Sequence, residues 1–224
     1  MPLSAPVARQ HLHTRRVTCT GYFREDGLFD IEGQITDEKT YEQDNEWRGK
    51  LKAGDYVHNM SIRLTIDRKM VIRDVEACTD HSPYRMCGDV APNFKALIGL
   101  RISGGFLKQA RERVGGTKGC THIVELLGPV GTTAFQTLGS DKAEALSREH
   151  WHKELAARGE SPPPGRKLEV KDYRAPSVMN TCHAWAEDSP VMRRWAPLHY
   201  TGPDRETVRT EAEARVRAGL PPEA

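Results

Sequence analysis

The chain has 224 residues, of which 38% are hydrophobic and 29% charged, with 33 basic against 31 acidic side chains. This length suits one substantial domain with its own core. Basic and acidic residues are nearly equal in number and do not form a basic patch, so we expect no nucleic-acid partner. No apolar run is long enough to cross a bilayer, and the first residues lack the apolar core of a secretory signal. We therefore expect no membrane partner and a cytoplasmic location.

Cysteine and glycine spacing argues against several kinds of site. The five cysteines are widely and irregularly spaced, without a C-x-x-C pair, which disfavours a disulfide framework or a zinc ribbon. The paired glycines do not form a G-x-G-x-x-G or G-K-[ST] phosphate loop. We therefore expect no cofactor.

Segments rich in β-branched and aromatic residues, separated by turn sequences, predict strands in the first third of the chain. They cover residues 13–23, 27–36, 56–66 and 69–79. Most of the joins are too short for crossover helices, so we predict an antiparallel meander of four or more strands. The longer polar stretch 37–55 is predicted as a loop that folds over a sheet edge.

Alternation along the strands predicts which side chains share a face. In the third strand, His58 falls with the apolar residues Met60 and Ile62, so we predict that it faces the core. In the second strand, Asp30 and Glu32 fall opposite the apolar residues. One face of the sheet should therefore be apolar and the other partly charged.

Helical periodicity and turn residues predict helices that begin near Pro92, Gly105 and Gly119, followed by a polar helix over residues 141–157. The predicted fold class is therefore α+β: a meander sheet, helices packed on one face, and an irregular C-terminal segment.

Domain boundaries follow from composition. We expect one domain over residues 1–202, with a core at 12–140 and a C-terminal flap at 166–202, because S-P-P-P-G at 161–165 is typical of a linker. Residues 203–224 are expected to form a charged tail, either helical or disordered.

The third predicted helix opens with G-C-T-H-I-V-E and carries a polar stripe beside its apolar one. His122 and Glu125 begin the stripe, which continues through Pro129, Thr132 and Gln136. A histidine at a helix N-terminus favours the neutral imidazole, which can act as a base near pH 7. We interpret His122 as a candidate base and Glu125 as the group that orients it. The alternative is that His122 caps the helix and that Glu125 bonds a backbone group or an arginine.

Three further groups are weighed as parts of a site. His58 could meet His122 from the apolar face of the sheet, although a core histidine is often structural. Arg15 is a candidate catalytic cation. Asp30 and Glu32 are candidates for substrate binding with it, or charges on an exposed sheet face.

The C-terminal segment N-T-C-H-A-W-A-E-D contributes His183 as a candidate catalytic residue. Trp185 and Trp195 flank it and are candidates for binding a flat aromatic ligand, or parts of a packed flap. Cys120 at the helix N-terminus is a candidate nucleophile or a buried inert thiol. The roles of Cys120 and Cys182 stay open.

A metal site is considered because histidines and a carboxylate are ligand-capable. The candidate ligands are His58, His122, Glu125 and His183. The sequence lacks an H-E-x-x-H motif, and one H-x-x-E arises easily by chance among nine histidines. We therefore expect no metal.

Six segments taken together resemble a bacterial family of unknown function, over about residues 12–202. They are LHTRRV, DGLFDIEGQITDEKTY, VHNMSIRLTID, IRDVEACTDHSPYRMC, GCTHIVELLGP and TCHAWAEDSPV. The resemblance implies a role in the catabolism of aromatic compounds. In sphingomonad-like bacteria it implies a cofactor-independent lyase that acts on lignin-derived aromatic dimers and releases formaldehyde from a hydroxymethyl side chain, leaving a stilbene-type product.

The residues are compatible with that chemistry: His122 as base, Glu125 as its orienter, and Arg15 or His183 near the departing oxygen. The partner would be a small aromatic molecule. The alternatives are a hydrolase or isomerase acting on a small aromatic or acyl compound, and a non-catalytic binding protein. Whether the chain forms a homo-oligomer is left open.

Overall fold

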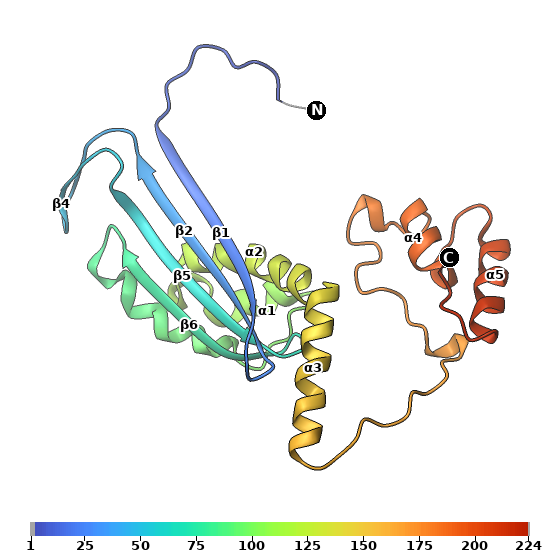
Figure 1. Ribbon diagram of the computed structural model, residues 1–224. Helices are drawn as coiled ribbons and strands as arrows, with labels where there is room; N and C mark the ends of the chain where they lie inside the picture. Colours follow the sequence, from blue (N-terminus) through green and yellow to red (C-terminus); the bar gives the residue numbers. More distant parts are fainter. Residues whose placement is uncertain (1–2, 224) are drawn as a thin grey trace. The chain divides into compact units, whose positions relative to one another are not determined.

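The computed structural model describes residues 3–223 (Figure 1). Its contacts divide the chain into two compact units, Met1–Ser161 and Pro162–Ala224. The boundary lies in the proline-rich linker, whereas the sequence placed a domain end at residue 202. Helix α5 (Arg205–Arg217) belongs to the second unit and buries Val208, Ala212 and Val216, so this helix has a packed face.

The first unit is built on a four-stranded antiparallel sheet with the order β1-β2-β5-β6. Its strands are β1 (His13–Phe23), β2 (Phe29–Lys39), β5 (Tyr56–Ile66) and β6 (Ile72–His81). The predicted meander and the α+β class are confirmed. The expected loop at 37–55 instead contains the end of β2 and a small hairpin, β3 (Gln43–Asn45) and β4 (Gly49–Leu51).

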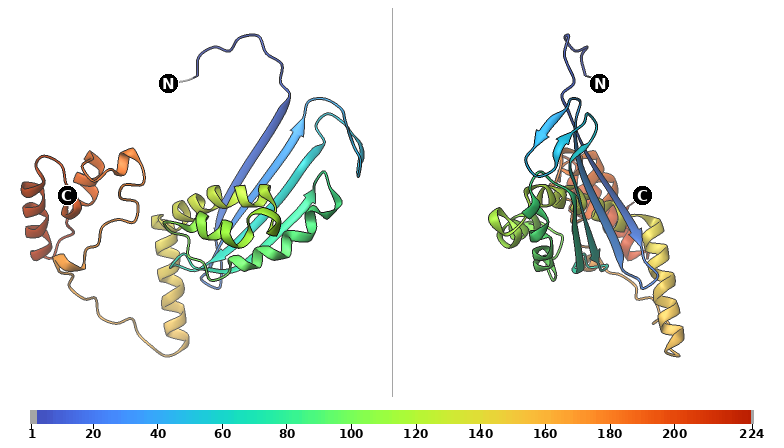
Figure 2. Two further views of the ribbon diagram at one scale, coloured as in Figure 1. Left: turned by 180° about the vertical axis from the view of Figure 1, so that it is seen from behind. Right: turned by 90° about the vertical axis from the view of Figure 1, so that its left-hand side faces the viewer.

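Helices follow the sheet in the chain. They are the 3₁₀ helices η1 (Arg85–Leu97) and η2 (Gly116–Lys118) and the α-helices α1 (Phe106–Val114), α2 (Thr121–Leu138) and α3 (Asp141–Ala157). Figure 2 shows α1, α2 and η1 over one face of the sheet. Pro92 lies inside η1 rather than at the start of an α-helix, and the tighter 3₁₀ turn takes the place of the expected regular helix.

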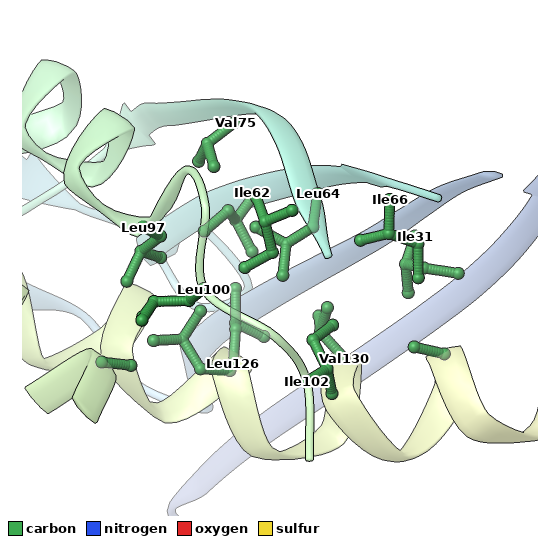
Figure 3. Close-up of a cluster of buried hydrophobic side chains, with 14 of the residues drawn as sticks. Ile31, Ile62, Leu64, Ile66, Val75, Leu97, Leu100, Ile102, Leu126 and Val130 are labelled. Carbon is green, nitrogen blue, oxygen red and sulfur yellow. The ribbon is translucent and has the colours of Figure 1, made fainter. Parts of the chain in front are cut away.

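The core lies between this sheet face and α2 (Figure 3). Ile31, Ile62 and Leu64 of the sheet are fully buried, as are Leu126 and Val130 of α2. The apolar face formed by alternating strand residues therefore packs against the apolar stripe of α2, which buries both from water.

Glycine allows α2 to approach β2 closely. A Cβ atom placed on Gly33 would lie 2.5 Å from Cγ2 of Val130. No relaxed packing accommodates such a separation, so the absence of a side chain at Gly33 sets the distance between helix and sheet.

The opposite sheet face is polar, as predicted. Arg63 on β5 donates to Glu32 of β2 and to Glu76 of β6, each at 2.8 Å. These exposed cross-strand pairs stabilise the sheet only modestly, but they keep this face hydrophilic.

The second unit is small and mostly irregular. It contains η3 (Val170–Asp172), η4 (His183–Trp185), α4 (Pro190–Trp195), η5 (Pro197–His199) and α5. Its core consists of Met192, Ala196, Tyr200 and Val208, with Trp185 packed against them. Among the helices of residues 3–223, none is long and apolar enough to cross a membrane.

Candidate functional site

A nearly buried carboxylate organises one end of the sheet. Asp37 has 1% of its side chain exposed, although it carries a charge. Its Oδ1 lies 2.9 Å from Nε2 of His13. Arg15 donates from Nε and Nη2 to its two oxygens, each at 2.9 Å. His58 Nδ1 lies 2.9 Å from Oδ2. Four contacts therefore satisfy the carboxylate, which a charge this deeply buried requires.

Strand register explains why these side chains meet. Arg15 and His58 are the cross-strand partners of Asp37 on β1 and β5, so the three side chains point to the same face. A register irregularity follows directly, between Asp37 and Glu38. Such irregularities redirect side chains near strand ends.

Helix α2 adds two residues from its first turns. Nε2 of His122 lies 3.9 Å from Oδ2 of Asp37. The rings of His122 and His58 stack with centroids 3.9 Å apart and planes inclined by 31°. Glu125 accepts from Nη1 of Arg15 at 2.7 Å. Arg15 therefore bridges the buried Asp37 and the exposed Glu125.

The protonation states follow from burial and charge. Burial raises the pKa of Asp37, but the hydrogen bonds and charge of Arg15 outweigh this effect and hold the pKa at about 2. Burial lowers the pKa of His58, and the neighbouring His122 lowers it further. Burial followed by the charge of Arg15 lowers the pKa of His122. The cluster thus combines an anionic carboxylate with two imidazoles that favour the neutral form near pH 7.

A thiol lies beside the imidazole pair. Cys120 is the residue before α2, and its Sγ lies 3.8 Å from Nδ1 of His122 and 3.4 Å from Sδ of Met60. It is half-buried between a ring and a core methionine.

The structure brings together four of the residues singled out in the sequence: Arg15, His58, His122 and Glu125. Their arrangement differs in one respect from the expected one. The carboxylate of Glu125 pairs with Arg15, and the carboxylate nearest to the two imidazoles is that of Asp37.

The expected acidic partners lie on the other face of the sheet. Asp30 accepts from Arg24 at 3.2 Å and from Thr65 at 2.6 Å. Glu32 pairs with Arg63. Strand alternation separates both from Arg15, which lies on the helix-covered face.

Three other candidates belong to the second unit. His183 and Trp185 form η4, and Trp195 ends α4 with 56% of its surface exposed. Their assignment to the site stays a prediction.

The polar stripe of α2 faces solvent for most of its length. Pro129, Thr132 and Gln136 are exposed, whereas His122 keeps 21% of its side chain accessible. The stripe is thus the outer side of an amphipathic helix, and only its first residue contributes to the imidazole pair.

Sequence reasoning missed Asp37 and His13. Asp37 was placed in the loop because the long stretch that begins there is polar. The signal was nevertheless present: Ile31, Gly33, Ile35 and Asp37 continue one alternating series on the core side. Asp37 ends this series and lies opposite His58 of β5. A carboxylate in that position indicates a buried polar cluster.

The cluster also offers a set of metal-ligating atoms. One atom each from Asp37, His58 and His122 can be chosen so that all lie within 4.8 Å of one another. The expectation of no metal rested on missing sequence motifs, and these three residues come from three separate elements, which no local motif records.

Comparison with known proteins covers this part of the chain. A family model described as "Protein of unknown function (DUF2889)" matches residues 13–136, from the start of β1 almost to the end of α2. Neither a curated protein nor a solved structure matches the chain. The matched segment covers more than half of the chain and includes the whole cluster around Asp37. The protein therefore belongs to the DUF2889 family.

Proposed function

We propose that this protein is a lyase of aromatic-compound catabolism that releases formaldehyde from the hydroxymethyl side chain of a lignin-derived aromatic dimer. The observation that carries the proposal is the convergence of two imidazoles and an arginine on one buried carboxylate at the end of the sheet. The substrate class comes from the family resemblance, and the cluster supplies groups suited to the chemistry.

The reaction needs a proton acceptor. In the proposed step the imidazole of His122 takes the proton of the primary alcohol. The bond between the hydroxymethyl carbon and its neighbour breaks, and formaldehyde leaves. The released electron pair forms a carbon–carbon double bond and expels an oxygen from the adjacent carbon. That oxygen receives the proton, so the reaction is balanced, involves no net redox change and needs no electron-carrying cofactor.

The other residues have separate roles in this scheme. Asp37 holds His58 by a 2.9 Å contact, and the His58 ring stacks on His122 and positions it. Arg15, with 37% of its side chain exposed, presents a cation to the negative charge that develops on the departing oxygen. Asp37 thus takes the orienting role that the sequence suggested for Glu125.

The test is a panel of lignin-type dimers that carry a primary alcohol. Formaldehyde and the near-ultraviolet absorbance of a conjugated product should appear together. His122→Ala should lower the rate by about 10² or more while circular dichroism stays unchanged, because a positioned base contributes on this scale. His152→Ala, on the exposed face of α3, is the matched control.

Two outcomes would replace the proposal. A product whose mass shows addition of water, or no change in mass, would favour a hydrolase or an isomerase. Binding of a dimer without turnover would favour a non-catalytic binding protein.

A further inference from the structure

We infer that Asp37, His58 and His122 form a binding site for one divalent transition-metal ion of the zinc class. The proposed lyase reaction does not require such an ion, so this inference goes beyond it and is tested without substrate. It stands on the geometry and chemistry of three side chains from β2, β5 and α2.

The spacing of the donor atoms fits a single ion. Zinc lies about 2.0–2.2 Å from nitrogen and oxygen ligands, so tetrahedral ligands stand roughly 3.4 Å apart. Asp37 Oδ2 is 2.9 Å from Nδ1 of His58 and 3.9 Å from Nε2 of His122. One separation is shorter and the other longer than the required value. Shifts of about half an ångström in each would bring the two nitrogens to the same distance from Oδ2, as an ion bound by all three atoms needs.

The donor types select the class of ion. Two imidazoles and one carboxylate suit zinc, iron, cobalt or nickel, whereas calcium and magnesium prefer sites made entirely of oxygen. The anionic Asp37 and the two rings that favour the neutral form already have the protonation states that these metals need.

Binding would require two local rearrangements at Oδ2 of Asp37. Nη2 of Arg15 donates to this oxygen at 2.9 Å and would withdraw from it, while Nε keeps its contact with Oδ1. An ion would replace the proton between His58 Nδ1 and Asp37 Oδ2, and that proton would be carried on the other ring nitrogen of His58. Oδ1 would keep its contacts with His13 and Arg15, which act as outer partners that orient the carboxylate.

Arg15 disfavours metal binding, because its positive charge lies next to the carboxylate of Asp37. Its charge would weaken the affinity for a cation, but its exposed position allows water to screen it. The site has three protein ligands and lies next to solvent-accessible groups, so its remaining position would be open to water or a small molecule.

The experiment uses the full chain, stripped with a chelator and then titrated with Zn²⁺ in a calorimeter. Co²⁺ serves as a second probe, because its visible spectrum reports nitrogen and oxygen coordination. His58→Phe and His122→Phe are the test variants, since they keep a stacked ring but remove the donor. His152→Ala removes an exposed histidine outside the cluster and is the control for adventitious metal binding at the surface.

We expect one equivalent of Zn²⁺ in the wild type and in His152→Ala. Each phenylalanine variant should lose more than the roughly 10- to 100-fold in affinity that outer-partner mutations typically cost. The inference is overturned if the wild type binds no stoichiometric metal, or if both phenylalanine variants retain wild-type affinity and Co²⁺ spectrum while folded. Loss of binding in His152→Ala would also overturn it by placing the metal on the surface.

Discussion

Asp37 and His58 are cross-strand neighbours on β2 and β5, joined by a 2.9 Å contact between Oδ2 and Nδ1 at the point where the strand register becomes irregular. This pair ties the sheet to the cluster, because Asp37 also holds Arg15 on β1, and the ring of His58 stacks on His122 of α2. One carboxylate therefore joins three strands and approaches a helix. Its removal should affect stability as well as chemistry.

We predict that Asp37→Asn lowers the free energy of unfolding by about 3 kcal/mol, the lower end of the range for breaking a buried ion pair. The lower end applies because Arg15 is 37% exposed and can regain water. Glu32→Gln on the exposed face is the control and should cost less than about 1 kcal/mol. Urea unfolding of both variants measures the difference. Equal losses would show that Asp37 is not a structural centre.

The strands were more predictable from the sequence than the site. The residue ranges expected for β1 and β5 match the structure, because segments rich in β-branched and aromatic residues end at turn sequences there. Asp37 lay beyond the predicted end of β2, since the long polar stretch that begins there resembles a loop. A strand that continues past its apolar residues is stabilised by tertiary hydrogen bonds, which the local pattern does not record.

The sequence offered an arginine as one possible partner of Glu125, but it did not identify which arginine. Helical spacing correctly places it one turn from His122, but the partner that it selects, Arg15, is 110 residues away. Helical periodicity predicts which residues share a face of α2. It does not predict which charged residue of the sheet contacts that face.

We predict that Gly33→Ala destabilises the protein by about 1–3 kcal/mol, because its Cβ would meet Val130 and force helix and sheet apart. Gly104→Ala is the control, since no atom lies within 4 Å of its added Cβ. Val130→Ala is made alone and in the Gly33→Ala background, where the combined loss should be smaller than the sum of the two single losses, and thermal unfolding of the five proteins, wild type included, measures it. Strictly additive losses in the double variant would contradict a steric clash at this position.

Asp67, in the turn between β5 and β6, should make stability depend on pH. Burial raises the pKa of Asp67, but the N–H groups of Val71 and Lys69, with Arg73, lower it below its ordinary value. A carboxylate with a lowered folded-state pKa contributes stability above its unfolded pKa of about 3.9, and the contribution is lost as pH falls through the folded value.

The stability difference between the wild type and Asp67→Asn should therefore be largest near neutral pH and shrink below about pH 4. Denaturant unfolding at several pH values measures it, with exposed Glu25→Gln as the control. A difference that grows as the solution is acidified would contradict the assigned direction.

The proposed reaction and the inferred metal site share one nitrogen, so together they predict that zinc inhibits turnover. Nε2 of His122 cannot accept the alcohol proton while it coordinates an ion. Formaldehyde release should fall as Zn²⁺ is added, with half-inhibition near the dissociation constant measured by calorimetry, and should return when a chelator removes the metal.

The opposite result would be equally informative. Activity that disappears with the chelator and returns with Zn²⁺ would keep the metal site but replace the imidazole base, because a bound ion can itself lower the pKa of a coordinated hydroxyl. In that case His58→Phe and His122→Phe should lose metal and activity together.

Under the proposed mechanism, His58→Phe should lose metal while retaining more activity than His122→Phe, since its ring still stacks on the base. The ratio of activity to bound metal across these two variants therefore separates the two mechanisms.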